Sequence, residues 1–176
     1  LEFSDNIYNL IVSKKTLHSS PLLSDQWSEK TAVLITYANS ITTTNNISPL
    51  SSLEKFVSSK CQKFIDTVHI LPFFPSSSDD GFAVKDYYNV DDEFGDWKDI
   101  INISKSFRVM ADVVINHGSS EGVWFKNFIK GEGRGHDYFL SFDNTFDITE
   151  VVRPRTSPLL NTFDTHDGTR YLWCTF

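Results

Sequence analysis

The run from Arg108 to His117, Arg-Val-Met-Ala-Asp-Val-Val-Ile-Asn-His, constrains the fold most, because it is almost continuously apolar and rich in β-branched residues. A strand covered on both faces shows such a run instead of alternation, as in parallel sheets packed between helices or closed into a barrel. Asp112 interrupts the run, although a carboxylate is rarely buried without a partner. Asn116 and His117 follow where a barrel strand delivers side chains to the rim that carries active sites. The same pattern also fits a satisfied core Asp and a helix-capping Asn.

Two shorter apolar runs precede this strand, and segments with helical spacing separate the three. In chain order the predicted elements are a strand at 31–37, a helix at 51–64, a strand at 67–71, a helix at 97–106 capped by Asp96, and the strand at 108–117. This alternation predicts right-handed βαβ crossovers and a parallel sheet. The loop 73–95 is long for a compact domain, and loops of that length are uncommon unless functional.

Apolar residues at helical spacing predict which faces of the two helices are buried. The predicted buried residues are Leu53, Phe56, Val57 and Phe64 in the first helix and Trp97, Ile100, Ile101 and Ile103 in the second.

The segments outside this alternation predict two further parts. Residues 5–17 have helical spacing, so we expect residues 1–30 to form an N-terminal helical extension. Residues 31–118 are then the first part of a barrel domain. Residues 119–176 hold Gly-Glu-Gly-Arg-Gly, Arg-Pro-Arg and an apparent strand at 170–176, which predicts an inserted, loop-rich and incomplete subdomain. Both ends of the sequence suggest a chain cut from a longer one.

The composition of the chain excludes some classes of binding partner and indicates its location. Hydrophobic content of 40% and charged content of 22% are those of a globular protein. The formal net charge of −7 argues against a nucleic acid or an anionic membrane as partner. The two cysteines, Cys61 and Cys174, lack metal-ligand spacing and are too few for a disulfide framework. We therefore expect a reducing, cytoplasmic location, small-molecule partners and no membrane span, because no apolar stretch approaches the ~20 residues required.

Two stretches together resemble the α-amylase family of retaining glycoside-active enzymes. Residues 112–117 resemble the signature at the end of its third barrel strand, and residues 81–95 resemble its loop after the second strand. Within that family the chain is most similar to the sucrose phosphorylases and their glucosylglycerate phosphorylase relatives. The segments that carry this similarity are 34–38, 68–74, 151–160 and 172–176.

The resemblance implies the front part of a (β/α)8 TIM barrel, strands 1 to 3, with a subdomain inserted after strand 3. It implies a retaining α-glucosyl phosphorylase that transfers glucosyl from sucrose or a glucosylglycerate-type glucoside to inorganic phosphate, giving glucose 1-phosphate without a cofactor. The nucleophile and the acid/base of such enzymes come from later strands, so we expect no catalytic carboxylate within these residues. Two alternatives stay open: a hydrolase or transglucosidase of the same family, and a non-catalytic carbohydrate-binding relative.

The resemblance also assigns a glucosyl pocket. Asp79 matches a carboxylate that accepts hydrogen bonds from the far hydroxyls of the sugar, a role that suits an ionised group. Phe82 stands where relatives place an aromatic platform, His117 matches a histidine near the reacting centre, and Phe176 matches an aromatic lining residue. A solvated loop carboxylate at Asp79 and ordinary loop packing at Phe82 are the alternatives.

Four further residues receive roles beside this pocket. Arg153 and Arg155 flank a proline that favours an extended backbone, and together could clamp phosphate or an acidic acceptor; a surface pair is the alternative. We expect Asp112 to hold neighbouring loops. Asn116 matches a calcium ligand of many amylases that sucrose phosphorylase relatives lack, and no dense oxygen-ligand cluster follows it, so we expect no metal.

Overall fold

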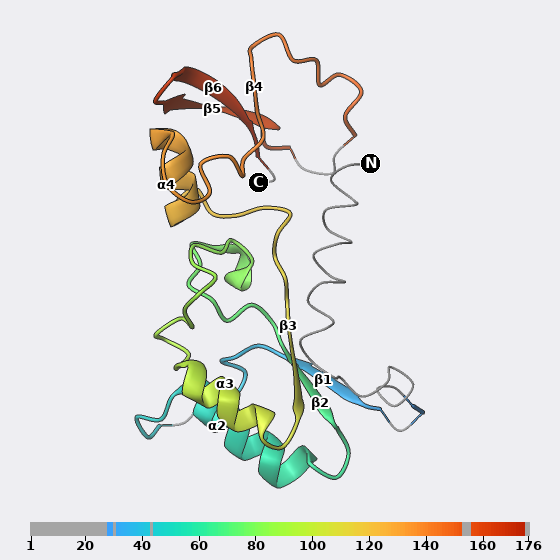
Figure 1. Cartoon of the computed structure of the whole chain (residues 1–176). Coiled ribbons are helices and arrows are strands. Elements are labelled where there is room, and N and C mark those ends of the chain that lie inside the picture. The colour runs from blue at the N-terminus through green and yellow to red at the C-terminus, as the bar shows by residue number, and fades with distance from the viewer. Residues whose placement is uncertain (1–27, 30, 43, 153–155, 175–176) are drawn as a thin grey trace, which may run out of the picture. The chain divides into compact units, whose positions relative to one another are not determined.

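The computed structural model describes residues 28–29, 31–42, 44–152 and 156–174 (Figure 1). The chain divides into two compact units, residues 1–32 and 33–176. All helices and strands named below belong to the second unit. The helix predicted within residues 5–17 lies outside the described residues.

Three parallel strands form the first sheet, as the alternation of strands and helices predicts. They are β1 (Val33–Thr36), β2 (Thr67–Ile70) and β3 (Arg108–Ala111), in the order β1-β2-β3 (Figure 1). Ile35, His69 and Met110 stand opposite one another in the register. The parallel sheet is therefore confirmed, with all three carboxyl ends at one edge.

Strand β3 is shorter than expected. It ends at Ala111, because the opposite residue, Ile70, is the last residue of β2. The chain then runs to the loop after β2, where the Ser119 N–H donates to the Val84 carbonyl. The prediction that the run 108–117 is covered on both faces is also wrong. Of the three strands only β2 is well buried, and Val113 and Ile115 are 77% and 82% exposed. The run is apolar without being covered in this structure.

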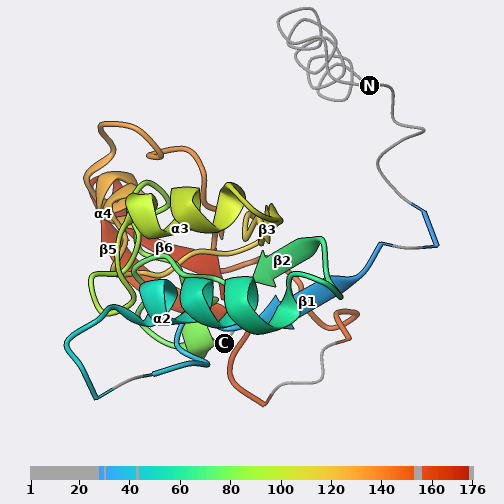
Figure 2. The same ribbon diagram turned by 90° about the horizontal axis from the view of Figure 1, so that it is seen from below.

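Two helices pack against one face of this sheet. Helix α2 (Pro49–Phe56) begins two residues before the predicted start, since the Ser48 hydroxyl accepts from the Ser51 N–H and Pro49 suits the first turn. It continues as a π-helical turn, η2 (Val57–Cys61). Helix α3 (Trp97–Ser104) has the predicted Asp96 cap, in a capping box with Asp99. Figure 2 shows α2 and α3 side by side.

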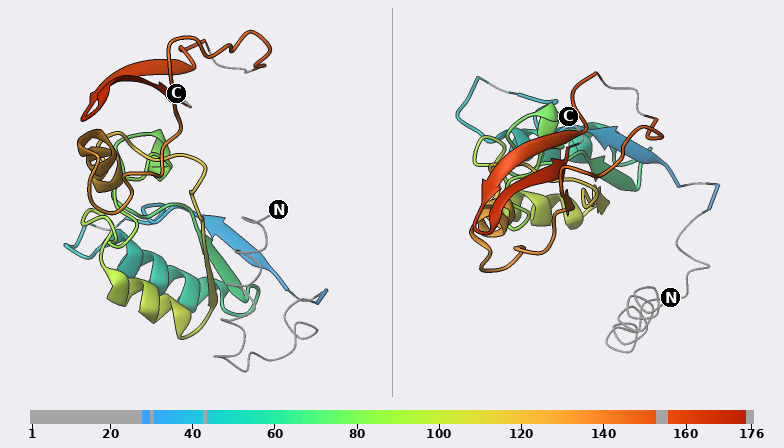
Figure 3. Two further views of the ribbon diagram at one scale, coloured as in Figure 1. Left: turned by 45° about the horizontal axis from the view of Figure 1, so that its top comes forward. Right: turned by 90° about the horizontal axis from the view of Figure 1, so that it is seen from above.

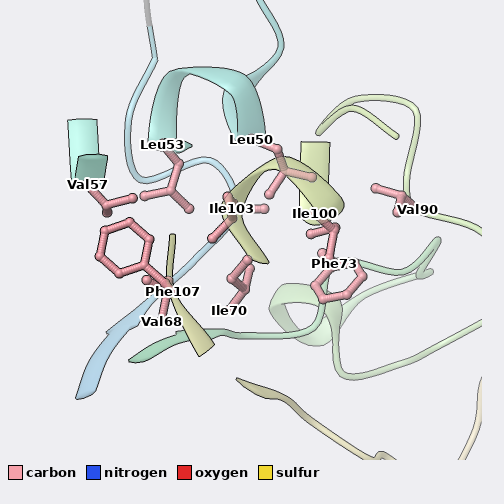
Figure 4. Packing of buried hydrophobic residues seen from close by; sticks show 11 residues of the cluster. Leu50, Leu53, Val57, Val68, Ile70, Phe73, Val90, Ile100, Ile103 and Phe107 are labelled. Atoms are coloured by element: carbon pink, nitrogen blue, oxygen red, sulfur yellow. The ribbon is translucent and has the colours of Figure 1, made fainter. Parts of the chain in front are cut away.

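The core lies between these helices and β2. Figure 4 shows its side chains converging: Leu50, Leu53 and Val57; Val68, Ile70 and Phe73; Ile100, Ile103 and Phe107; and Val90. The predicted burial of Leu53, Val57, Ile100 and Ile103 is confirmed. The predicted burial of Phe56, Phe64, Trp97 and Ile101 is wrong, because these side chains are exposed, Phe64 by 75% and Ile101 by 55%. Helix α2 ends at Phe56 and continues as a π turn. A π turn has more residues per turn than an α-helix, so the α-helical spacing that predicts a buried Phe64 no longer holds after Phe56.

The region after His117 is more regular than its sequence suggests. It contains α4 (Val123–Lys130) and an antiparallel sheet in the order β4-β6-β5, with β4 (Ser141–Phe142), β5 (Leu160–Thr165) and β6 (Gly168–Trp173). The apparent strand at 170–176 is β6 in part, and residues 175–176 lie outside the described residues. Figure 3 shows α4 beside the β5–β6 hairpin. Among the described residues no helix has the length and apolarity to span a membrane.

Candidate functional site

The loop after β2 carries the first predicted site residues on a strained turn. Asp79 and Asp80, within the short helix η3 (Asp79–Gly81), have φ of 61° and 50°, the left-handed region that disfavours residues with a Cβ. Gly81 follows with φ of 99°, and a Cβ there would lie 2.5 Å from the carbonyl oxygen of Pro72. The turn is thus pressed against the end of β2 while both carboxylates remain exposed to solvent.

Hydrogen bonds join this turn to His117. The Phe82 N–H donates to the Asp79 carbonyl at 2.9 Å, and the Phe82 carbonyl lies 3.1 Å from Nε2 of His117. A carbonyl only accepts, so Nε2 carries the proton in this arrangement. The structure therefore brings together three residues that the sequence analysis placed in one glucosyl pocket: Asp79, Phe82 and His117. Their proposed contacts with a sugar stay predictions.

Contacts that the sequence analysis missed hold the same two segments together. The Tyr87 hydroxyl donates to the His117 carbonyl at 3.2 Å, and burial raises the pKa of Tyr87, so the hydroxyl stays protonated as a donor. The hydroxyls of Ser77 and Ser119 are 2.7 Å apart, and Ser119 is buried. The sequence feature that could have indicated these contacts is the pair Tyr87-Tyr88 after Asp86. The hydroxyl of a tyrosine that packs inside a long loop requires a hydrogen-bond partner.

Asp112 bonds a neighbouring strand instead of a loop. Its Oδ2 lies 3.1 Å from Nε2 of His69 on β2. The carboxylate thus joins the carboxyl ends of β2 and β3, and a supporting role for Asp112 stays a prediction. Asn116 is exposed.

A hollow of about 610 Å³ opens at the carboxyl ends of β1 and β2. Its lining contains three carboxylates, of Asp80, Asp91 and Glu93, and one cation, Lys85, with serine hydroxyls between them. Carboxylates and hydroxyls at this density suit a ligand rich in hydroxyl donors. The carboxylate of η3 that lines the hollow is Asp80, next to the predicted Asp79. The full lining is Tyr37, Ala38, Asn39, Pro72, Ser76, Ser77, Ser78, Asp80, Gly81, Lys85, Asp91, Glu93 and Phe94.

The remaining predicted binding residues, Arg153, Arg155 and Phe176, lie outside the described residues, so their roles stay predictions. Within the part of the chain that the structure describes, no three His, Cys, Asp or Glu side chains are grouped to hold a metal.

Parallel strands alternating with helices, with polar loops gathered at the carboxyl ends of the strands, define the class of α/β proteins that bind small molecules at that edge. The sequence profile described as "Alpha amylase, catalytic domain" matches residues 63–170. The chain belongs to this family.

Similar proteins agree with this assignment. The chain is 43% identical over 150 residues to the glucosylglycerate phosphorylase of Allomeiothermus silvanus and 42% identical over 151 residues to that of Escherichia coli. Each match covers 85% of this chain and 27% of the relative, so the chain spans about a quarter of the curated relatives' length. The crystal structure of sucrose 6F-phosphate phosphorylase from Thermoanaerobacter thermosaccharolyticum superposes with a TM-score of 0.71 at 28% identity, covering 90% of this chain and 34% of that one.

Proposed function

We propose that this chain is the glucosyl-binding front part of a retaining α-glucosyl phosphorylase. The observation that carries the proposal is the bonded group of Asp79, Phe82 and His117 at the strand ends of a chain similar to phosphorylases. Glucosyl from sucrose or a glucosylglycerate-type glucoside passes to an enzyme carboxylate, and phosphate then attacks to give glucose 1-phosphate with retained configuration. Phosphate is a co-substrate, no cofactor is needed, and the enzyme works in the cytoplasm.

The three parallel strands are, in this proposal, strands 1 to 3 of a (β/α)8 barrel, and residues 119–176 belong to a subdomain inserted after strand 3. The nucleophile and the acid/base belong to the part of the relatives' fold that this chain does not cover, since retaining cleavage needs two carboxyl groups about 5 Å apart. The acidic, hydroxyl-rich hollow beside Asp80 suits a sugar better than an anion. Phosphate therefore requires cations elsewhere, which we assign to Arg153 and Arg155.

The test uses a full-length protein that contains these residues, with sucrose or glucosylglycerate and increasing phosphate. We expect glucose 1-phosphate to form in proportion to substrate consumed, and the isolated 176-residue chain to form none. Free glucose as the main product at saturating phosphate would favour the hydrolase alternative. No turnover by the full-length protein, with retained sugar binding, would favour the carbohydrate-binding alternative.

Arg155→Ala sharpens this test. Loss of a charged, bidentate partner should raise the half-saturating phosphate concentration about tenfold or more, while glucosyl-enzyme formation stays largely intact. The matched control is Arg134→Ala, which removes an exposed arginine whose guanidinium lies over the ring of Tyr88. An unchanged phosphate dependence in Arg155→Ala would return Arg155 to the surface-charge interpretation.

A further inference from the structure

Tyr87 is a half-buried residue at the junction of the two site segments, and the proposed function gives it no role. Its ring stacks on Trp124, the second residue of α4, with centroids 4.7 Å apart and planes 13° from parallel. A third ring, Phe74, packs against it at 6.2 Å. The tyrosine therefore packs the loop after β2 against the first turn of α4, with its ring between Phe74 and Trp124.

The Tyr87 hydroxyl reaches the backbone of the site histidine. It donates to the His117 carbonyl at 3.2 Å. A Cβ added at the neighbouring Gly118 would lie 3.5 Å from the Tyr87 hydroxyl oxygen. The chain at 117–118 thus lies directly against the tyrosine hydroxyl. The backbone carbonyl of His117 is bonded to Tyr87, and the His117 ring is bonded to the Phe82 carbonyl.

We propose that Tyr87 is the positioning residue of His117 for glucosyl transfer. By anchoring the His117 carbonyl to a ring fixed on Trp124, Tyr87 holds the imidazole where Nε2–H meets the Phe82 carbonyl, and so selects one tautomer and one orientation toward the sugar. Tyr87 touches no substrate in this role. The catalytic consequence depends on the proposed function, whereas the effect on the imidazole does not.

Tyr87→Phe isolates the hydroxyl, because phenylalanine keeps the stack on Trp124 and the contact with Phe74. The matched control is Tyr88→Phe: the Tyr88 ring also meets Trp124, edge-on at 6.3 Å, but packs under the guanidinium of Arg134. Both variants lose one tyrosine hydroxyl beside the same tryptophan, so thermal unfolding of each shows whether folding is affected equally.

The first readout is the His117 imidazole in the 176-residue chain, observed by long-range ¹H–¹⁵N correlation. We expect a single Nε2–H tautomer in the parent chain and in Tyr88→Phe, and a mixture of tautomers in Tyr87→Phe. An unchanged His117 signal in Tyr87→Phe would overturn the proposal. This measurement needs no enzymatic activity, so it remains decisive if the phosphorylase assignment fails.

The second readout is a double-mutant cycle in the full-length enzyme. Tyr87→Phe should lower kcat for glucosyl transfer about three- to tenfold, the effect of one net hydrogen bond, with little change in KM. In a His117→Ala background the same substitution should have no further effect on kcat. Equal effects in both backgrounds would mean that Tyr87 acts only through general packing.

Discussion

At the scale of single residues, Gly81 sets the shape of the candidate site. Its backbone has φ of 99°, and the space that a Cβ would fill is already taken by the Pro72 carbonyl. Two aspartates in the left-handed region come immediately before it. Such strain persists only where the surroundings enforce it, and both aspartates of the strained turn are exposed to solvent.

Gly81→Ala should destabilise the chain and disturb this turn. The matched control is Gly168→Ala, because Gly168 has a similar φ of 116° but nothing within 4 Å of its Cβ position. Both substitutions incur the backbone cost of about 1–3 kcal/mol, and only Gly81→Ala adds a clash with main-chain atoms. Chemical denaturation of both variants measures the difference. Equal losses of stability would show that the turn can move away from Pro72.

At the scale of secondary-structure elements, Asp99 links two helices. Its Oδ2 accepts from the Ser48 hydroxyl at 3.0 Å and from the Asp96 N–H at 3.2 Å, and its Oδ1 accepts from the Ser51 hydroxyl at 2.6 Å. One carboxylate thus completes the capping box of α3 and binds the first turn of α2.

Asp99→Ala should therefore cost more than an ordinary cap, about 2–3 kcal/mol of unfolding free energy, because three bonds are lost together. Asp99→Asn, which keeps one side-chain acceptor, should lose about half of that. Urea unfolding followed by far-UV circular dichroism measures both. A loss below about 1 kcal/mol in Asp99→Ala would show that the two helix ends are capped independently.

The stability of the β5–β6 hairpin should depend on pH in the acid range, because Asp167 lies in its turn. The Arg170 guanidinium and the Thr165 hydroxyl hold the pKa of Asp167 far below its ordinary value. Because the folded pKa is the lower one, the stabilisation is present above the ordinary carboxyl pKa of about 4 and is lost as pH falls below it. Asp167→Asn should destabilise the hairpin at pH 7, and the difference from the parent chain should shrink between about pH 5 and pH 2.

Backbone amide exchange and chemical shifts of β5 and β6 across this pH range report the loss. Arg170→Gln, which removes the first-named cause of the lowered pKa, should flatten the pH dependence. A difference between Asp167→Asn and the parent that stays constant from pH 7 to pH 2 would contradict the role of the Arg170 contact.

The sequence predicts elements better than it predicts their contacts. Apolar runs and caps such as Asp96 depend on neighbouring residues, so the parallel strands and α3 were predictable. The end of β3 was not, because it depends on where β2 ends, and Ile70 lies far from Ala111 in the sequence. The joining of Phe82 to His117 was predicted only as a shared pocket, since a backbone carbonyl acceptor leaves no mark in the residue types.

At the scale of the molecule, the edge of the parallel sheet at β3 is open and continues into an exposed apolar segment. Strand β3 pairs with β2 on one side only in the order β1-β2-β3, and the extended segment after it places Val113 and Ile115 on one side, 77% and 82% exposed. An open strand edge bearing apolar side chains is a template for pairing with another chain. The formal net charge of −7 opposes such pairing at low salt and is screened at high salt.

The isolated chain should therefore self-associate with increasing concentration, more strongly at high salt. Ile115→Lys should suppress this association, because a lysine at a strand edge must lose its hydration when a second strand pairs there. Ile101→Lys makes the same change of charge on the surface of α3, at a side chain that is 55% exposed, and should leave association nearly unchanged. Sedimentation velocity over a concentration series at two salt concentrations distinguishes the variants. Equal suppression by both lysines would attribute the association to exposed apolar surface in general instead of to the edge of β3. A monomeric parent chain at every concentration would show that the edge is not available for pairing.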